Sequence, residues 1–176
     1  MIQEVSLYFE YTLYRGNRTT KISAEHFNAF TSPNFPELVE SGVHLKVNNA
    51  ILLKQKTTKK LKVNINFDDN VLILKLFPGI NKTILHSLLH TPNLKGVILE
   101  TYGSGNAPME NWFISEIEDA IQRGLHIVNV TQCSGGSVIM GTYETSTQLK
   151  ELGLISGKNI TTEAAITKLM YLLGQN

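Results

Sequence analysis

The chain has 176 residues, of which 42% are hydrophobic and 18% are charged, and its formal net charge is +1. This length suits a soluble globular protein with one domain, or one domain and part of another, and it is sufficient for a sizeable core. A net charge near zero favours neither nucleic acid nor an acidic membrane as a partner, and no apolar run reaches the roughly 18 residues of a membrane-spanning helix.

The chain contains a single cysteine, Cys133. A disulfide within the chain is therefore impossible, which fits a reducing compartment. The first residues, MIQEVSLYFEY, carry an acidic side chain where a signal peptide would be basic. We therefore expect a cytoplasmic protein that has no membrane partner.

The first 53 residues mix strand-like and turn-like segments. EVSLYFEYTLY, residues 4–14, has the composition of a β-strand. SAEHFNAF, residues 23–30, is compatible with a short helix capped by Ser23. Two prolines shortly afterwards predict a loop.

Residues 54–70 form the most polar part of the chain, with five lysines between Lys54 and Lys62. A nucleic-acid patch is one interpretation, but no aromatic side chains alternate with these lysines. A solvated linker is the favoured interpretation for so short a charged run.

From residue 71 onward, apolar strands alternate with amphipathic helices. Asn81 and Thr161 are expected to cap helices, and Gly124 is expected to end one. This alternation predicts an α/β fold, with a parallel sheet and flanking helices. The expected strands are residues 71–77, 95–101 and 125–130, and the expected helices are residues 81–92, 109–124, 143–153 and 161–175.

Each of the three expected strands is followed by a loop rich in glycine and small polar residues. The loops are FPGI at 77–80, TYGSGNAP at 101–108 and TQCSGGS at 131–137. In an open parallel sheet, ligands bind beyond the carboxyl ends of the strands. Glycine allows close approach to a ligand, and the carboxamide of Asn106 can both donate and accept hydrogen bonds.

Two of these loops partly match known motifs. GSGNAP resembles a dinucleotide fingerprint, but Pro108 stands in place of the third glycine and no acidic residue ends the next strand, so NAD binding is not expected. TQCSGGS could expose Cys133 as a nucleophile. However, Thr131 occupies the place of the glycine that normally precedes such a nucleophile, so a buried or ligand-adjacent thiol is favoured.

His86 and His90 are four residues apart on an expected helix, a spacing that can bind zinc. No glutamate of a zinc motif lies between them, and the sequence shows no third ligand. A surface or partly packed histidine pair is therefore favoured, and no metal is expected.

LYRGNRTTK, residues 13–21, brings Arg15, Arg18 and Lys21 close together in sequence. Exposed, solvated side chains are the simplest interpretation. If Lys21 instead sits in a cleft beside the arginines, its pKa falls and it can act as a general base.

Seven motifs in this order resemble the later part of a cytoplasmic type-I bacterial L-asparaginase, and the resemblance is weak only across residues 46–70. The motifs are LYRGNRTTK, AFTSPNFPELVESG, LFPGI, ETYGSGNAP, NVTQCSGGSV, MGTYETS and LISGKNITTEAAITKLMYLLG. The resemblance implies that residues 1–53 are the end of an N-terminal α/β domain, residues 54–70 a linker, and residues 71–176 most of a C-terminal domain.

The family reaction is hydrolysis of L-asparagine to L-aspartate and ammonia through a threonine acyl-enzyme, with no cofactor. The family motifs TGGTI, with the nucleophilic threonine, and HGTDT, with a second threonine and an aspartate, do not occur in this sequence. The chain also stops before the family's usual final helices. We therefore expect a fragment that is inactive alone, because it lacks the nucleophile.

The resemblance implies roles for four residues. Lys21 matches the lysine that works with the missing threonine and aspartate to activate a nucleophile. Asn106 matches an asparagine that reaches towards the active site of a neighbouring subunit. Thr20 and Cys133 match residues lining an allosteric asparagine site, where Glu100 replaces an arginine that could clamp a carboxylate. The same regulation is therefore in doubt here.

The expected partners are L-asparagine or L-aspartate and further copies of the chain, as a dimer or tetramer. Residues 1–53 have apolar positions that need partners, namely Val5, Leu7, Phe9 and Leu13. Two alternatives remain open. The chain could come from the asparaginase-like subunit of a tRNA-dependent amidotransferase, or it could be a non-catalytic module for amino-acid binding or oligomerisation.

Overall fold

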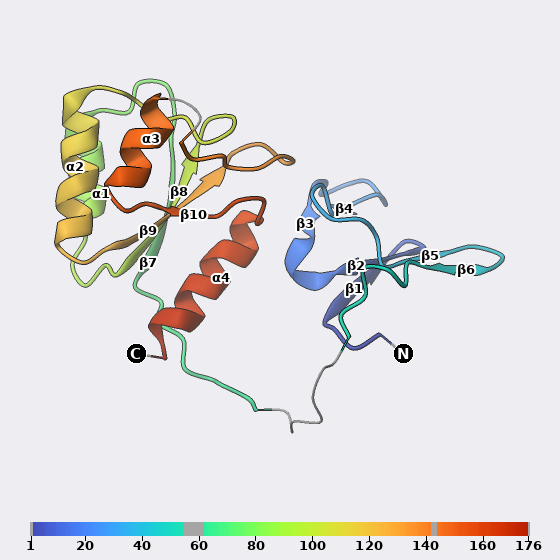
Figure 1. Ribbon diagram of the computed structural model, residues 1–176. Helices are drawn as coiled ribbons and strands as arrows, with labels where there is room; N and C mark the ends of the chain where they lie inside the picture. The colour runs from blue at the N-terminus through green and yellow to red at the C-terminus, as the bar shows by residue number, and fades with distance from the viewer. Residues whose placement is uncertain (1, 55–61, 142–143, 176) are drawn as a thin grey trace. The chain divides into compact units, whose positions relative to one another are not determined.

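A computed structural model describes residues 2–54, 62–141 and 144–175, with the backbone alone for residues 144–146 (Figure 1). The central lysines of the expected linker, within residues 55–61, lie outside the described residues. Across the described ranges, no helix is both long and apolar enough to cross a bilayer.

The chain forms two compact units, residues 1–65 and 66–176. The first unit holds a four-stranded antiparallel sheet in the order β1-β2-β5-β6 and a separate pair, β3 with β4. Its elements are β1 (Ser6–Phe9), β2 (Thr12–Arg15), the 3-10 turn η1 (Gly16–Arg18), β3 (Thr20–Lys21), β4 (Phe30–Thr31), β5 (Val39–Ser41) and β6 (Leu45–Val47).

The strand-like segment at residues 4–14 is a hairpin, not one continuous strand. β1 and β2 pair around a two-residue turn at Glu10 and Tyr11, whose φ angles are +43° and +64°. Two-residue hairpin turns with positive φ usually contain asparagine or glycine. The Glu-Tyr pair carries no such signal, so the sequence did not reveal the turn.

The prediction of a helix at residues 23–30 is wrong. Ser23 does accept hydrogen bonds from two backbone N–H groups, those of Glu25 and His26. This contact forms a local serine turn, since no helix follows it. The segment then closes as a loop, with the N–H of Ile22 donating to the carbonyl of Ala29.

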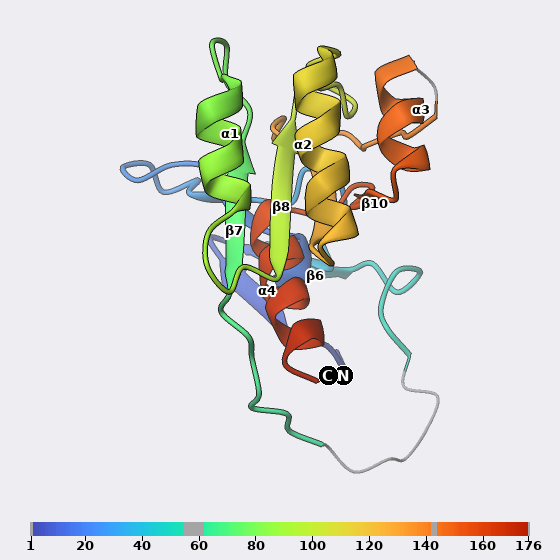
Figure 2. The same ribbon diagram turned by 90° about the vertical axis from the view of Figure 1, so that its left-hand side faces the viewer.

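The second unit is a parallel sheet with helices on both faces, which confirms the α/β prediction (Figure 2). The strand order is β10-β9-β8-β7. Its elements are β7 (Val71–Lys75), α1 (Lys82–Leu89), β8 (Gly96–Thr101), α2 (Asn111–Gln122), β9 (His126–Thr131), α3 (Glu144–Glu151), β10 (Ile155–Ser156) and α4 (Thr162–Leu173).

The two faces of this sheet carry separate apolar clusters. Along β8, Val97 and Leu99 belong to a large cluster with α1, α2 and α3, whereas Ile98 packs with residues of α4. Strands buried on both sides explain the nearly continuous apolar runs in the sequence.

The helix ends follow the predicted signals. The side chain of Asn81 accepts a hydrogen bond from the N–H of Ile84 at the start of α1. Thr161 caps α4 in the same way, through the N–H of Ala164. Gly124 follows α2 with a φ of +93°, so it ends that helix as expected.

The short strand β10 was not expected from the sequence. It pairs in parallel with β9, and the N–H of Gly157 just beyond it donates to the carbonyl of Asn129. A Cβ at Gly157 would lie 2.8 Å from that carbonyl oxygen. The strand therefore depends on a glycine that lets two backbones approach closely.

Within the second unit, Asp68 anchors the segment before β7 to the start of β8. Its carboxylate contacts Nζ of Lys95 at 2.5 Å and accepts two hydrogen bonds from Asn70. The hydrogen bond from Lys95, followed by those from Asn70, lowers the pKa of Asp68 from 3.8 to about 2. The ionised carboxylate thus favours the folded state.

Replacing Asp68 with asparagine should lower the stability of the second unit at neutral pH and flatten its acid dependence. Because the folded pKa is depressed, the stabilisation is present above pH 4 and is lost as the pH falls from about 4 to about 2. Thermal unfolding of both proteins over this range measures the effect. A gap in Tm that stays constant down to pH 2 would contradict it.

Candidate functional site

The parallel strands β7, β8 and β9 end at one edge of the sheet and bring their loops together there, as the sequence predicted. The hydroxyl of Thr131 donates to the carbonyl of Gly103 at 2.5 Å. The N–H of Ile139 donates to the carbonyl of Ser104 at 3.0 Å. The loops after β8 and β9 therefore form one connected surface, the carboxyl-edge surface, comprising residues 101–108 and 131–139.

Gln132 braces this edge across three strands. Its side-chain N–H donates to the carbonyl of Leu76, just beyond β7, at 2.6 Å and to that of Glu100 on β8 at 2.9 Å. The carbonyl of Glu100 also accepts a hydrogen bond from the N–H of Leu76 at 3.0 Å. The amide of Gln132 therefore joins the loop after β9 to the ends of both β7 and β8. The sequence drew attention to the neighbouring cysteine, but gave no separate signal for this residue.

The loop that carries Asn106 closes on itself. Tyr102 and Asn106 exchange backbone hydrogen bonds of 2.9 and 2.8 Å. Gly103 and Gly105 have φ angles of +50° and +116°, and the second value is strained for any side chain. The carboxamide of Asn106 is half-buried and, in the described part of the chain, forms no hydrogen bond with another residue. It is therefore available to a ligand.

A buried polar pair lies beneath this loop. The hydroxyl of Thr101 donates to Oδ1 of Asn129 at 2.6 Å, and both residues have 0% exposure. Nδ2 of Asn129 has no partner among the described residues, and a Cβ on Gly105 would lie 3.5 Å from it. An asparagine within the apolar run HIVNVT was a visible signal that the prediction from sequence missed.

Cys133 is exposed at the carboxyl-edge surface. Its N–H donates to the hydroxyl of Thr131 at 3.0 Å, which fixes the start of the loop. The buried location considered from the sequence is wrong.

Glu100 points towards the start of α4. Its carboxylate accepts a hydrogen bond of 2.6 Å from the hydroxyl of Thr162. The acidic side chain at this position is thus half-buried and anchored by a neighbouring element of the same unit.

Thr20 and Lys21 lie in the first unit, on β3, where they pair with Thr31 and Phe30. Lys21 is exposed, and Nζ lies 5.9 Å from the centre of the Phe30 ring. A cavity of about 530 Å³ in the same unit does not include Lys21 in its lining, which comprises Glu10, Ile22, Ser23, His26, Phe27 and Asn28. Lys21 is thus an exposed residue of β3 that lies outside the lining of this cavity.

The two arginines of the same motif gather around one aromatic ring. The guanidinium carbons of Arg15 and Arg18 lie 4.2 and 5.6 Å from the centre of the Phe35 ring. Burial, and then the charge of Arg15, lower the pKa of Arg18. Arg15 also contacts Glu4, and this hydrogen bond lowers the pKa of the carboxyl. The two arginines therefore link β2 and η1 to the segments that carry Glu4 and Phe35.

Comparison with known families gives two matches along the chain. Residues 70–176 match the glutaminase/asparaginase C-terminal domain, and residues 1–53 match the N-terminal asparaginase domain. The chain belongs to the asparaginase family. The resemblance drawn from the seven sequence motifs is thereby confirmed.

Proteins with three different names are similar to this chain. L-asparaginase 1 of Escherichia coli is 42% identical over 99% of the chain and 51% of its own length. The 60 kDa lysophospholipase of Mus musculus is 41% identical, over 99% of the chain and 31% of its length. A more distant relative, a glutamyl-tRNA(Gln) amidotransferase subunit of Methanobrevibacter smithii, is 28% identical over 97% of the chain and 39% of its length.

The crystal structure of L-asparaginase I from Vibrio cholerae has a TM-score of 0.91 with this chain and is 38% identical. The match covers 99% of this chain and 52% of the Vibrio protein. The chain thus spans about half the length of these two bacterial L-asparaginases.

Proposed function

We propose that the chain supplies part of an L-asparaginase active site, which hydrolyses L-asparagine to L-aspartate and ammonia through a threonine acyl-enzyme. The main support is the carboxyl-edge surface, where interlocked loops hold the Asn106 carboxamide without a partner in the described part of the chain. An amide in this state can hydrogen-bond to the polar groups of a small amino acid.

Lys21 and Asn106 have different roles in this proposal. Lys21 corresponds to the family lysine that, with a threonine and an aspartate, activates a nucleophile. Asn106 would contact substrate in a neighbouring copy, so the active form is a homo-oligomer. The threonine and aspartate motifs are absent from the 176 residues, so we propose that the chain is inactive without polypeptide that supplies them.

We also propose that regulation differs from that of bacterial allosteric members. Thr20 and Cys133 correspond to residues of the family's effector site. Glu100 stands at the arginine position, and its carboxylate is engaged by Thr162. An arginine there would attract the carboxylate of an asparagine effector, whereas a glutamate repels it.

The proposal can be tested by measuring ammonia release from asparagine and glutamine. The 176-residue chain alone should give no enzymatic turnover, and co-expression with a polypeptide that carries the TGGTI and HGTDT segments should restore it. In the restored assembly, Asn106→Ala should raise KM for asparagine, because a substrate contact is lost.

Asn111→Ala serves as a matched control, since Asn111 is exposed at the start of α2. Turnover by the chain alone would place a nucleophile within these residues and contradict the proposed division of the site. Unchanged KM in Asn106→Ala would remove this residue from substrate binding. Ammonia release only in the presence of a charged tRNA would favour the amidotransferase alternative.

A further inference from the structure

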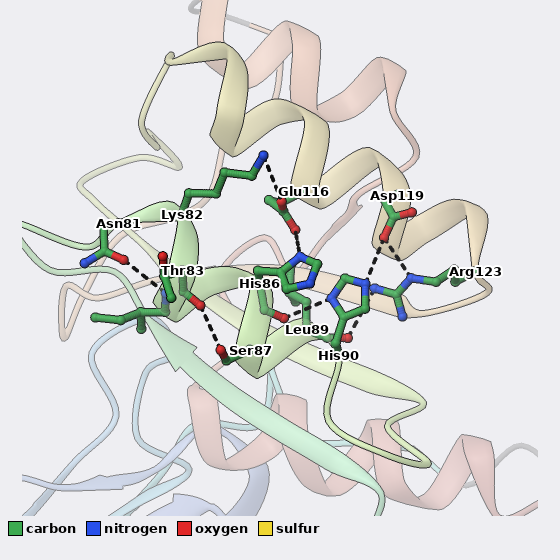
Figure 3. Close-up of polar contacts among 11 residues, drawn as sticks. Asn81, Lys82, Thr83, His86, Ser87, Leu89, His90, Glu116, Asp119 and Arg123 are labelled. Carbon is green, nitrogen blue, oxygen red and sulfur yellow. Dashed lines mark hydrogen bonds and ion pairs between the residues drawn. The ribbon is translucent and has the colours of Figure 1, made fainter.

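Three potential metal ligands meet between α1 and α2 (Figure 3). His86 and His90 belong to α1 or its end, and Glu116 lies on α2, 30 residues after His86. One ligand atom from each residue lies within 4.8 Å of the others. The histidine spacing was visible in the sequence, but the third ligand comes from the packing of two helices.

The orientation of His90 suits a metal ligand. Its Nδ1 lies 2.9 Å from the carbonyl of His86, which can accept the ring proton. This bond fixes the tautomer in which the proton is on Nδ1, and it leaves the lone pair on Nε2 for a cation. Asp119 lies 3.5 Å from that Nε2 and is itself held by Arg123 at 2.8 Å. A second carboxylate is thus fixed beside the proposed ligand atom.

Glu116 brings a buried negative charge to the cluster. Its side chain is 9% exposed, and its two oxygens contact Nδ1 of His86 at 2.9 Å and Nζ of Lys82 at 3.8 Å. The His86 and His90 rings are stacked, with 3.8 Å between their centres. Two imidazoles and one carboxylate form a ligand set that suits zinc and other divalent transition metals.

We propose that His86, His90 and Glu116 form a binding site for a divalent transition metal of the zinc class, with an open position for water. On binding, the cation takes the place of the proton between His86 Nδ1 and Glu116. In a neutral imidazole this proton moves to Nε2 of the same ring, so that His86 binds the metal through the lone pair on Nδ1. Lys82, the longer contact, stays outside the ligand set.

The proposed metal would cross-link α1 and α2 and would take no part in asparagine hydrolysis. α1 and α2 begin after the loops at the carboxyl edge and run back across the same face of the sheet. His90 follows the last residue of α1, so it lies at the end of the helix away from that edge. Metal binding should therefore raise the unfolding temperature of the second unit and have little effect on KM for asparagine.

A hydrogen-bonded network without a metal would also satisfy Glu116, through His86 and Lys82. His90→Gln distinguishes the two possibilities, because Figure 3 draws no hydrogen bond or ion pair between His90 and Glu116, so the loss of His90 leaves the carboxylate paired with His86 and Lys82. The experiment titrates the untagged 176-residue chain with Zn²⁺ by calorimetry and records thermal unfolding with and without the ion.

The unaltered chain should bind one Zn²⁺ and unfold at a higher temperature with it. His90→Gln should bind Zn²⁺ at least about tenfold more weakly, and the ion should raise its unfolding temperature less than that of the unaltered chain. The matched control His126→Gln, an exposed histidine of the same unit, and Cys133→Ser should bind as the unaltered chain does. Absence of zinc binding by the unaltered chain, or equal binding by His90→Gln, would overturn the proposal.

Discussion

Replacing Lys21 with methionine is expected to lower kcat for asparagine by roughly 10²- to 10⁴-fold in an assembly that hydrolyses this substrate, the range typical of general acid–base catalysis. Methionine keeps much of the side-chain length but cannot accept or donate a proton. The distance from Nζ to the centre of the Phe30 ring is 5.9 Å, so little packing energy depends on the ammonium group. The effect should fall on kcat, with KM nearly unchanged.

Lys46→Met is the matched control. Lys46 is an exposed lysine of the same unit, and its contact is a surface ion pair with Glu40 at 3.1 Å, an interaction that contributes little. Steady-state kinetics of both variants should separate loss of a specific amine from loss of positive charge. Near-normal turnover in Lys21→Met would remove this residue from the mechanism.

The second unit could be predicted from its sequence because each of its main elements has a local signal. The apolar runs of β7, β8 and β9 require a sheet that is covered on both faces. The caps Asn81 and Thr161 mark helix starts, and both side chains accept the expected hydrogen bonds. Since parallel strands end at one edge, the meeting of their loops followed without any knowledge of contacts.

The elements that could not be predicted from sequence lack such local signals. The β1–β2 hairpin turns at Glu10 and Tyr11, residues that seldom adopt positive φ. β10 has two residues and is stabilised by its parallel pairing with β9. Ser23 can either cap a helix or form a local turn, and tertiary contacts determine which of these two structures forms.

The candidate sites show the same division between local and distant information. Asn106 could be picked out because its loop is dense in glycine. Gln132 could not, because its role depends on carbonyls that lie 56 and 32 residues away in sequence. The third potential metal ligand, Glu116, was hidden for the same reason. Contacts between residues that are distant in sequence depend on how the helices pack on the sheet, and no local sequence pattern predicts them.

Phe113→Ala should destabilise the second unit by roughly 3–5 kcal/mol, which is the range for removing a buried aromatic side chain. Phe113 has 0% exposure and lies in the large cluster beneath α2. The cavity left by the ring cannot collapse easily, because packed strands and helices line it. Denaturant unfolding measures the loss through the fluorescence of Trp112, the single tryptophan, whose ring centre is 5.8 Å from that of Phe113.

Phe77→Ala provides the control, because the same atoms are removed from a side chain that is 44% exposed. It should change the unfolding midpoint much less, since less apolar surface returns to water. Reporting through Trp112 restricts the measurement to the second unit, so the behaviour of the first unit does not enter. Equal losses in the two variants would mean that α2 does not seal the core, and that the carboxyl-edge surface lacks rigid support from the elements beneath it.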